Sequence, residues 1–218
     1  LPERLSALAI GPGLGTEESS VAELNAALAR EIPLVLDADA LNLAGRDPAL
    51  QDRLAARQAP TVLTPHPAEA GRLLGITTAA VQADRLQAAL EIAKCLRALV
   101  VLKGCGSIIA TPDGRWFING TGHPGMASAG MGDVLTGLVV GFLAQGWPAE
   151  AALIAGVHLH GAAADRLARE GIGPIGLSAS ETIDAARGVF NGWLIEAQQG
   201  DLREKPRDAR PLLSLGAR

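Results

Sequence analysis

Cysteine and lysine are both scarce in this chain. Its 218 residues include two cysteines, Cys95 and Cys105, which lack the paired spacing of a zinc site and are too few for a disulfide framework. Lysine occurs only at positions 94, 103 and 205, and the formal net charge is −4. Nucleic-acid backbones are bound by clustered positive charge. The composition therefore argues against a nucleic-acid partner, and the cysteine usage predicts a reducing compartment, the cytoplasm.

Long apolar runs are missing as well. No stretch is long enough to cross a membrane, and the first residues do not follow the basic-then-apolar pattern of a signal peptide. Apolar residues make up 48% of the chain and charged residues 19%, which is ordinary for a globular protein. We therefore expect one domain over residues 1–199, with no membrane partner, and a charged tail over residues 200–218.

Short apolar runs alternate with helical patterns along most of the chain. Each run ends in glycine or polar residues, as buried strands do. The expected strands are 7–10, 34–36, 61–64 and 99–102, with a hairpin of 107–110 and 115–118. The expected helices are 17–30, a segment around Leu50 and Leu54, 68–74, 79–97, 133–145, 149–169 and 180–198. This alternation predicts an α/β fold with a mostly parallel sheet and a ligand site at the carboxyl ends of the strands.

A glycine-rich segment leads into one of these helices. Residues 119–137 read NGTGHPGMASAGMGDVLTG. The backbone amides of Gly130, Met131 and Gly132 would lie at the helix N-terminus, where unpaired amides and the helix dipole favour a phosphate. Asp133 in the first turn could take a proton from a substrate hydroxyl. The alternative is an ordinary acidic residue at a helix start after a glycine loop.

Three further segments agree with this one in order and spacing: IGPGLGT at 10–16, LDADALN at 36–42 and TPHPAE at 64–69. Together they resemble the signature of the ADP/ATP-dependent NAD(P)H-hydrate dehydratases, a branch of the ribokinase-like superfamily. The resemblance extends from about residue 7 to residue 183. It implies a three-layer α/β/α fold and a metabolite-repair lyase that uses ADP or ATP to dehydrate NADHX and NADPHX. It also implies Mg²⁺, and we expect a homo-oligomer such as a tetramer.

The resemblance assigns roles to individual residues. Asp133 would be the catalytic base, assisted by the amides of Gly130 and Gly132. Glu69 would organise Mg²⁺ through water. The hydrated dinucleotide would contact Gly13, Gly15, His66 and Asp133, and the adenine nucleotide would contact Lys103, Gly104, Cys105, Gly106, Ser107 and Gly132.

Each motif also has a structural interpretation. The GPGLG segment has neither the GxGxxG spacing nor a P-loop lysine, so it can be a plain turn. Asp37, Asp39 and Asn42 follow a strand, where they can reach a ligand or cap neighbouring amides. His66 lies between two prolines and can be structural, and Lys103 can be a surface lysine at a strand end.

Some positions depart from the family. His123 stands where asparagine is expected, and we expect it not to reproduce the paired donor and acceptor of an amide. His158 and His160 point to different faces of an apolar helix and are interpreted as structural or interfacial. The chain begins after the family's first strand and helix, so a truncated sheet with an unpaired edge is expected. Two rival functions remain: a ribokinase-like kinase of hydroxymethylpyrimidine or thiazole type, and a non-catalytic nucleotide-binding remnant.

Overall fold

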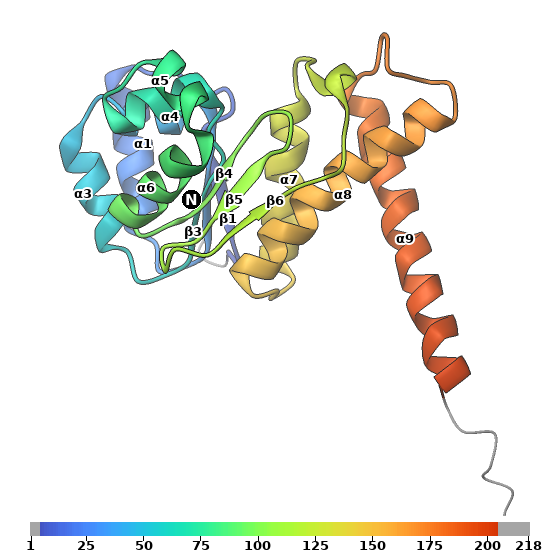
Figure 1. The fold of residues 1–218 in the computed structure, drawn as a ribbon. Coiled ribbons are helices and arrows are strands. Elements are labelled where there is room, and N and C mark those ends of the chain that lie inside the picture. Colours follow the sequence, from blue (N-terminus) through green and yellow to red (C-terminus); the bar gives the residue numbers. More distant parts are fainter. Residues whose placement is uncertain (1–4, 205–218) are drawn as a thin grey trace, which may run out of the picture.

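The computed structural model describes residues 5–204, which form a six-stranded sheet between two layers of helices (Figure 1). The strands are β1 (Leu8–Ile10), β2 (Leu34–Leu36), β3 (Thr61–Leu63), β4 (Leu99–Leu102), β5 (Ile108–Ala110) and β6 (Trp116–Ile118). The helices are α1 (Glu18–Leu28), α2 (Ala38–Ala44), α3 (Pro48–Ala56), α4 (Pro67–Leu74), α5 (Thr78–Ala83), α6 (Arg85–Leu96), η1 (Pro124–Met126), α7 (Met131–Ala144), α8 (Ala149–Arg169) and α9 (Ala179–Glu204).

The sheet follows the order of the sequence. Strands β1 to β4 are parallel neighbours, and β5 and β6 are added in antiparallel orientation beside β4. Strands β2 and β3 are buried on both faces, whereas β1 is only partly buried and β6 is exposed. The predicted α/β fold with a mostly parallel sheet is confirmed.

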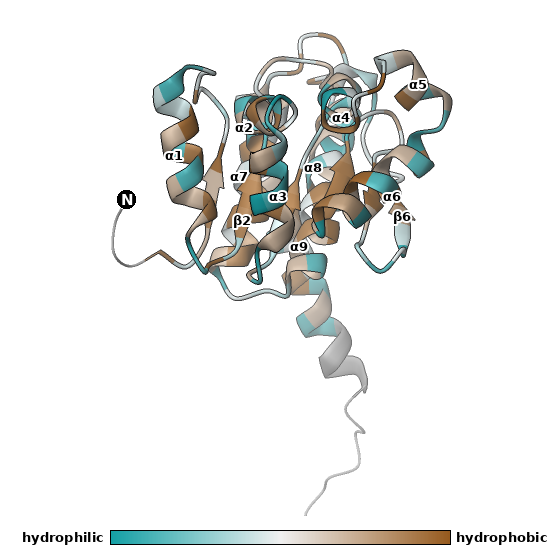
Figure 2. Cartoon of the chain, turned by 90° about the vertical axis from the view of Figure 1, so that its left-hand side faces the viewer, coloured by the Kyte–Doolittle hydropathy of each residue, from teal (hydrophilic) through white to brown (hydrophobic). Residues whose placement is uncertain are grey.

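Alternate side chains of strands β1 to β5 enter two separate cores. Leu34 and Leu36 pack with α1 to α6, whereas Val35 between them packs with α7, α8 and α9. This follows from the two-residue period of a strand, and it explains why the strand sequences are apolar throughout. Figure 2 shows the result, with brown strands in the middle and teal residues on the outward faces of the helices.

One predicted helix proves to be two. The chain was expected to be helical throughout residues 79–97, but α5 ends at Ala83 and α6 begins at Arg85. Asp84 has φ −145° between them, and its carboxylate accepts a hydrogen bond from the Gln87 amide. A side chain that caps a new helix competes with continuation of the old one. The heptad-like apolar pattern could not reveal this break.

The C-terminal helix extends past the predicted domain boundary. Helix α9 continues from Ala179 to Glu204, beyond residue 199. Residues 205–218 of the expected tail lie outside the described residues. None of the described helices combines the length and apolar character that a membrane span requires.

Candidate functional site

The carboxyl ends of the parallel strands bring three charged side chains together. Asp37 follows β2, Glu69 lies in the first turn of α4 after β3, and Lys103 follows β4. The Lys103 Nζ is 2.8 Å from Asp37 Oδ1 and 3.9 Å from Glu69 Oε2. Both carboxylates are almost fully buried, whereas the Lys103 side chain keeps 21% of its surface exposed. Lys103 therefore contacts two buried carboxylates and also reaches solvent at the carboxyl edge of the sheet.

Asp37 is held as a carboxylate by its partners. Thr136 of α7 donates a hydrogen bond to Asp37 Oδ2 at 2.9 Å, and Lys103 bonds Oδ1. Burial by itself raises the pKa of Asp37, but the charge and hydrogen bond of Lys103, with those of Thr64 and Thr136, outweigh it and lower the pKa below its ordinary value. Sequence analysis left Asp37 between ligand binding and capping; its carboxylate caps the Ala38 amide at the start of α2 at 2.9 Å, and it also fixes Lys103.

His66 and Glu69 form the start of α4. The Glu69 Oε2 accepts from the His66 backbone amide at 2.8 Å, and the amides of Ala68 and Glu69 donate to His66 Nδ1. The two residues thus form a reciprocal capping box around the proline at the first helical position, Pro67. Burial raises the pKa of Glu69, partly opposed by Lys103, and burial and then Lys103 lower the pKa of His66.

Helix α7 starts beside Lys103. Gly130 precedes it with φ 82°, a left-handed conformation that favours glycine. A Cβ on Gly132 would lie 3.3 Å from Lys103 Nζ, so the ammonium lies directly against the first turn of the helix. The Met131 amide is bonded to the Ser128 carbonyl at 3.4 Å, contrary to the expectation that it would face a phosphate. In the described part of the chain, the Gly132 amide remains unpaired near the lysine.

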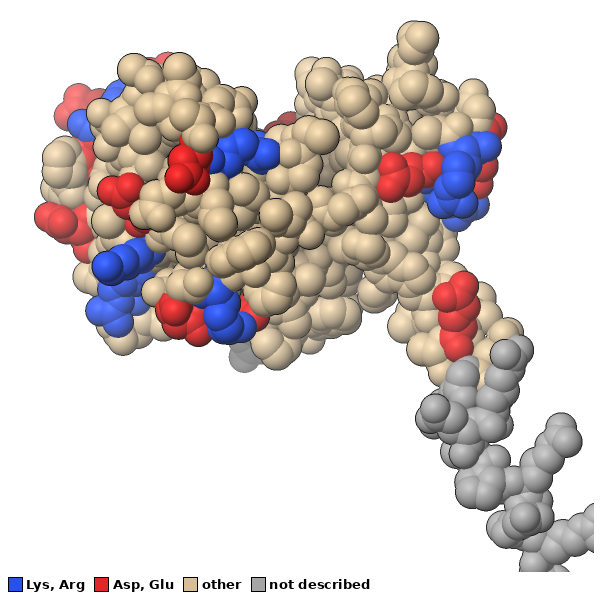
Figure 3. All heavy atoms as spheres, in the orientation of Figure 1, with Lys and Arg blue, Asp and Glu red and all other residues tan. Residues whose placement is uncertain are grey.

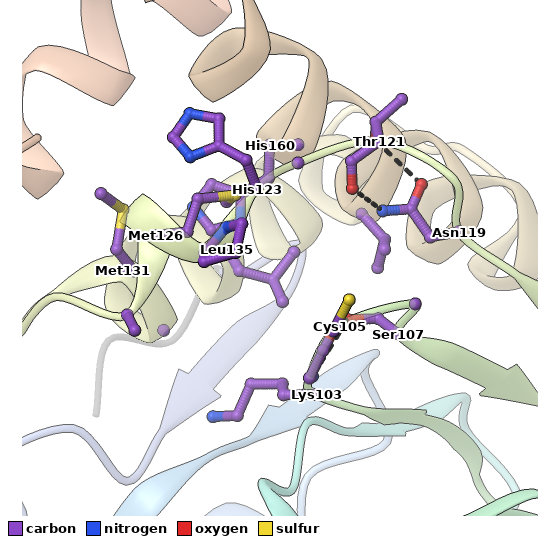
Figure 4. A pocket seen from close by; sticks show the side chains of 18 of the residues that line it. Lys103, Cys105, Ser107, Asn119, Thr121, His123, Met126, Met131, Leu135 and His160 are labelled. Atoms are coloured by element: carbon purple, nitrogen blue, oxygen red, sulfur yellow. Dashed lines mark hydrogen bonds between the residues drawn. The ribbon is translucent and has the colours of Figure 1, made fainter. Parts of the chain in front are cut away.

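A cavity of about 750 Å³ opens at this place. Figure 3 shows a hollow in the surface. It lies between the helices α4 to α6 on one side and the ends of α7 and α8 on the other. Figure 4 shows Lys103 and Cys105 on one side of the cavity and Met126, Leu135 and His160 on the other. The cavity is lined by these predicted site residues: His66, Lys103, Gly104, Cys105, Gly106, Ser107 and Gly132.

Five predicted site residues do not line this cavity: Gly13, Gly15, Glu69, Gly130 and Asp133. Asp133 is exposed in the first turn of α7, next to Gly132, and its carboxylate makes no hydrogen bond or ion pair within the described residues. Its role as a base stays a prediction.

The GPGLG turn lies at the end of β1. Gly13 and Gly15 have φ of 68° and 80°, and the Gly15 amide donates to Asp39 Oδ2 at 2.9 Å. A Cβ on Gly13 would meet no atom within 4 Å, so its surroundings are open. Asp39 therefore fixes a turn 24 positions away in the sequence, which differs from the predicted capping of neighbouring amides, and Gly13 faces free space in which a ligand could lie.

Arg85 holds the loop after β4 in place. Its guanidinium donates to the carbonyls of Cys105 at 2.7 Å and Leu102 at 3.3 Å. A Cβ on Gly104 would lie 2.7 Å from Arg85 Nη2, so glycine is required for this close approach. Sequence analysis missed Arg85, because nothing in the pattern of α6 distinguishes this arginine from others on helix surfaces.

His123 contradicts the expectation placed on it. The Gly125 amide donates to its Nδ1 at 3.0 Å, and its Nε2 is 3.1 Å from the Ala164 carbonyl. An amide can only donate and a carbonyl can only accept, so Nδ1 is the acceptor and Nε2 carries the proton. The ring thus supplies one acceptor and one donor, the pair of an amide side chain, and ties η1 to α8.

The two histidines of α8 have different environments. His158 is exposed and stacks on Trp193 of α9, with ring centroids 5.5 Å apart. His160 is buried and lines the cavity, and its interpretation as structural or interfacial stays a prediction. The predicted difference between their faces is confirmed.

The acidic side chains of the site fit a magnesium ion only if a bound ligand supplies further oxygen atoms. The described residues contain no group of three or more histidine, cysteine or acidic side chains that could hold a metal. Mg²⁺ commonly keeps several waters and is bound by one or two carboxylates plus substrate phosphates. Asp37 and Glu69, which both lie within 4 Å of Lys103, are the carboxylates that would fit an ion arriving with a nucleotide.

Comparison with known proteins agrees with this geometry. The family model described as NAD(P)H-hydrate dehydratase matches residues 1–185. The chain is 45% identical over 189 residues to the ADP-dependent (S)-NAD(P)H-hydrate dehydratase of Neisseria meningitidis, covering 86% of this chain and 64% of that protein.

Solved structures give the same result. The ADP/ATP-dependent NAD(P)H-hydrate dehydratase of Bacillus subtilis, co-crystallised with ATP/Mg²⁺, superimposes with a TM-score of 0.78 at 36% identity, covering 87% of this chain and 66% of that one. A ribokinase-like superfamily protein of Enterococcus faecalis gives a TM-score of 0.70 at 28% identity, covering 85% and 63%. The chain thus spans just under two thirds of the length of these relatives. With a fold that is ribokinase-like and a family model that matches most of its length, the chain belongs to the NAD(P)H-hydrate dehydratase family.

Proposed function

We propose that this chain dehydrates NADHX and NADPHX to NADH and NADPH at the expense of ADP or ATP. The observation that carries the proposal is the contact between the Lys103 ammonium and the first turn of α7 at the mouth of the cavity. A fixed positive charge and a helix N-terminus that meet at one point form a site for a phosphoryl group. Family membership supplies the substrate class.

The reaction would proceed in two stages. Asp133 would accept the proton of the ring hydroxyl while that oxygen attacks the terminal phosphoryl group, and the phosphoanhydride bond would break to release AMP or ADP. The Gly132 amide and Lys103 would stabilise the charge on the transferred group. The carbon–oxygen bond of the phosphorylated ring would then break, phosphate would leave, and loss of a ring proton would restore the double bond.

The remaining contacts divide between the two ligands. His66, Gly13 and Gly15 would bind the hydrated dinucleotide, and residues 103–107 would bind the adenine nucleotide. Glu69 would hold Mg²⁺ through water, and the ion would supply positive charge to the nucleotide phosphates.

The direct test is incubation of the protein with NADHX and ADP or ATP and Mg²⁺. We expect absorbance of NADH to appear together with one phosphate released per NADH, and no NADH without nucleotide. A kinase of the same fold would consume ATP on a small alcohol without forming NADH, and a nucleotide-binding remnant would bind ADP without any turnover. Either result would overturn the proposal.

We further propose that the protein is a homo-oligomer of the cytoplasm. Helix α9 exposes Ile183, Leu194 and Ile195 to between 47% and 57%, more apolar surface than one helix usually presents to water. Cys95 and Cys105 are both unpaired and exposed, which suits a reducing compartment. Light scattering coupled to size exclusion would give the mass, and a monomer at micromolar concentration would contradict the first part.

A further inference from the structure

His160 is a buried side chain with no partner for its ring. It retains 7% of its surface, and among the residues that the structure describes its Nε2 has no hydrogen-bond partner. The other histidines are satisfied or exposed: His66 and His123 cap helices, and His158 is exposed on the outer face of α8. Of the four, only His160 has a ring that is both buried and without a hydrogen bond to the described residues, and it lines the cavity.

Packing does not explain a histidine at this position. Val157 and Ala164 lie one turn before and after it on α8 and are both apolar and buried. A buried polar group without a hydrogen bond costs about 1–3 kcal/mol, which a leucine of similar size would avoid. The ring is therefore expected to find its partner in what enters the cavity.

The ring is neutral at physiological pH. Burial, and after it the positive charge of Lys103, lower the pKa of His160 to about 4. A neutral imidazole carries one donor and one acceptor. It can therefore bond an uncharged group such as a hydroxyl or the edge of a base, whereas it offers no charge to a phosphate. Lys103 supplies that charge at the other side of the cavity.

The neighbours of His160 favour the same part of a ligand. Leu135 and Val157 line the cavity with it, and Met126 and Met131 are close by on the same wall (Figure 4). Apolar side chains interspersed with uncharged polar groups, here Thr121, His123 and His160, suit a sugar or base ring better than a phosphate. The polar backbone of residues 104–107 and Lys103 occupy the opposite wall.

From these observations we infer that His160 hydrogen-bonds the nucleoside part of the adenine nucleotide and so aligns its phosphates with Lys103 and the first turn of α7. The inference rests on the proposed nucleotide site. It makes His160 a positioning residue, and it assigns specificity for the nucleoside to α8, a helix to which sequence analysis gave no role in binding.

Calorimetric titration of the whole chain with ADP and with inorganic pyrophosphate tests this. In the variant His160→Leu we expect ADP affinity to fall about tenfold, the equivalent of one neutral hydrogen bond, while pyrophosphate affinity stays the same. His160→Gln, which keeps a donor and an acceptor, should recover most of the loss. His158→Leu, the matched control on the outer face of the same helix, should bind ADP like the wild type.

Two nucleotide analogues locate the bond. With 2′-deoxy-ADP, which lacks a ribose hydroxyl, or inosine diphosphate, which changes the base edge, the wild type should lose affinity for one of the two. His160→Leu should show no such difference, because its partner is already gone. Equal affinity of the wild type for all three nucleotides would contradict the inference.

Thermal unfolding without ligand separates this role from a structural one. Because the unpaired nitrogen is removed, free His160→Leu should unfold at the same temperature as the wild type or higher. A lower unfolding temperature, unchanged ADP affinity, or an equal loss for pyrophosphate would each overturn the inference. If ADP binds and its binding depends on His160 but no dehydration occurs, the proposed reaction is wrong and the inference stands. If the wild type does not bind ADP, both are wrong.

Discussion

The lysine after β4 carries more of the site than its single charge suggests. Lys103 neutralises the buried Asp37, lies 3.9 Å from Glu69 and touches the first turn of α7. Breaking a buried ion pair by removing one partner leaves an uncompensated charge, which costs about 3–5 kcal/mol. The same residue thus contributes both to stability and to the proposed phosphate site.

The variant Lys103→Met should therefore lose in two measurements. ADP affinity should fall at least tenfold, and the free energy of unfolding should fall by about 3 kcal/mol because Asp37 stays buried without its partner. The matched control is Lys94→Met, at an exposed position of α6, which should change neither quantity. Urea unfolding and calorimetry check this, and wild-type ADP affinity in a folded Lys103→Met protein would remove the lysine from the site.

The lowered pKa of His160 predicts that the protein loses stability in mild acid. Its pKa is about 4 in the folded protein and 6.5 ordinarily, so the unfolded chain binds a proton first. Its contribution to stability is fully present above pH 6.5 and is lost as the pH falls toward 4, by about 1.4 kcal/mol per unit. Over this window, unfolding free energies of wild type should fall more steeply than those of His160→Leu. Parallel curves for the two proteins would contradict the burial of a neutral ring.

At the scale of elements, the start of α7 leaves little room for an added side chain beside Lys103. A Cβ on Gly132 would lie 3.3 Å from Lys103 Nζ and 3.4 Å from Asp37 Oδ2, so the lysine would have to shift. Gly137 is on the same helix, and a Cβ there would meet nothing within 4 Å. Glycine also weakens helix interiors relative to alanine.

We therefore expect Gly132→Ala to weaken ADP binding about tenfold with little loss of stability. Gly137→Ala should bind ADP normally and gain about 0.5–1 kcal/mol of stability. Calorimetry and urea unfolding of the two variants make the comparison. If both variants bind ADP equally well, the phosphate does not lie against the first turn of α7.

The reactivity of Cys105, in the loop after β4, can report whether a nucleotide covers this loop. Cys105 lines the cavity, and Cys95 is exposed on α6 away from it. Saturating ADP should slow alkylation of Cys105 at least fivefold, because bound ligand covers it. Alkylation of Cys95 should keep its rate and serves as the internal control. Mass spectrometry of the two peptides reads both rates, and equal rates with and without ADP would place the nucleotide elsewhere.

The elements were predictable to different degrees. Apolar runs located β2 and β4 because both faces of these strands are buried, and the glycine turn before Asp133 located α7. The break at Asp84, the contact of Arg85 with the loop after β4 and the donor–acceptor pair of His123 depend on side chains that meet across the fold. Sequence periodicity carries no information about such contacts. The burial of His160 beside the cavity was not predicted for the same reason.

At the scale of the whole molecule, the sheet arranges two binding regions along one edge. The turn after β1 contains Gly13 and is bonded to Asp39, which follows β2. The loop after β4 begins with Lys103 and lines the cavity. Helix α7 packs against β1 and β2, and its first turn, which contains Asp133, touches Lys103. This arrangement suits a reaction in which two nucleotide-like ligands meet at one carboxylate.

The most direct test of this account is the turnover of Asp133→Asn with NADHX and ADP, measured as NADH absorbance, beside its ADP affinity. We predict that turnover falls by about 10² to 10⁴, since a positioned base is lost, while ADP affinity stays within a few-fold of the wild type. Near-normal turnover by Asp133→Asn would contradict the central claim that this carboxylate accepts the proton.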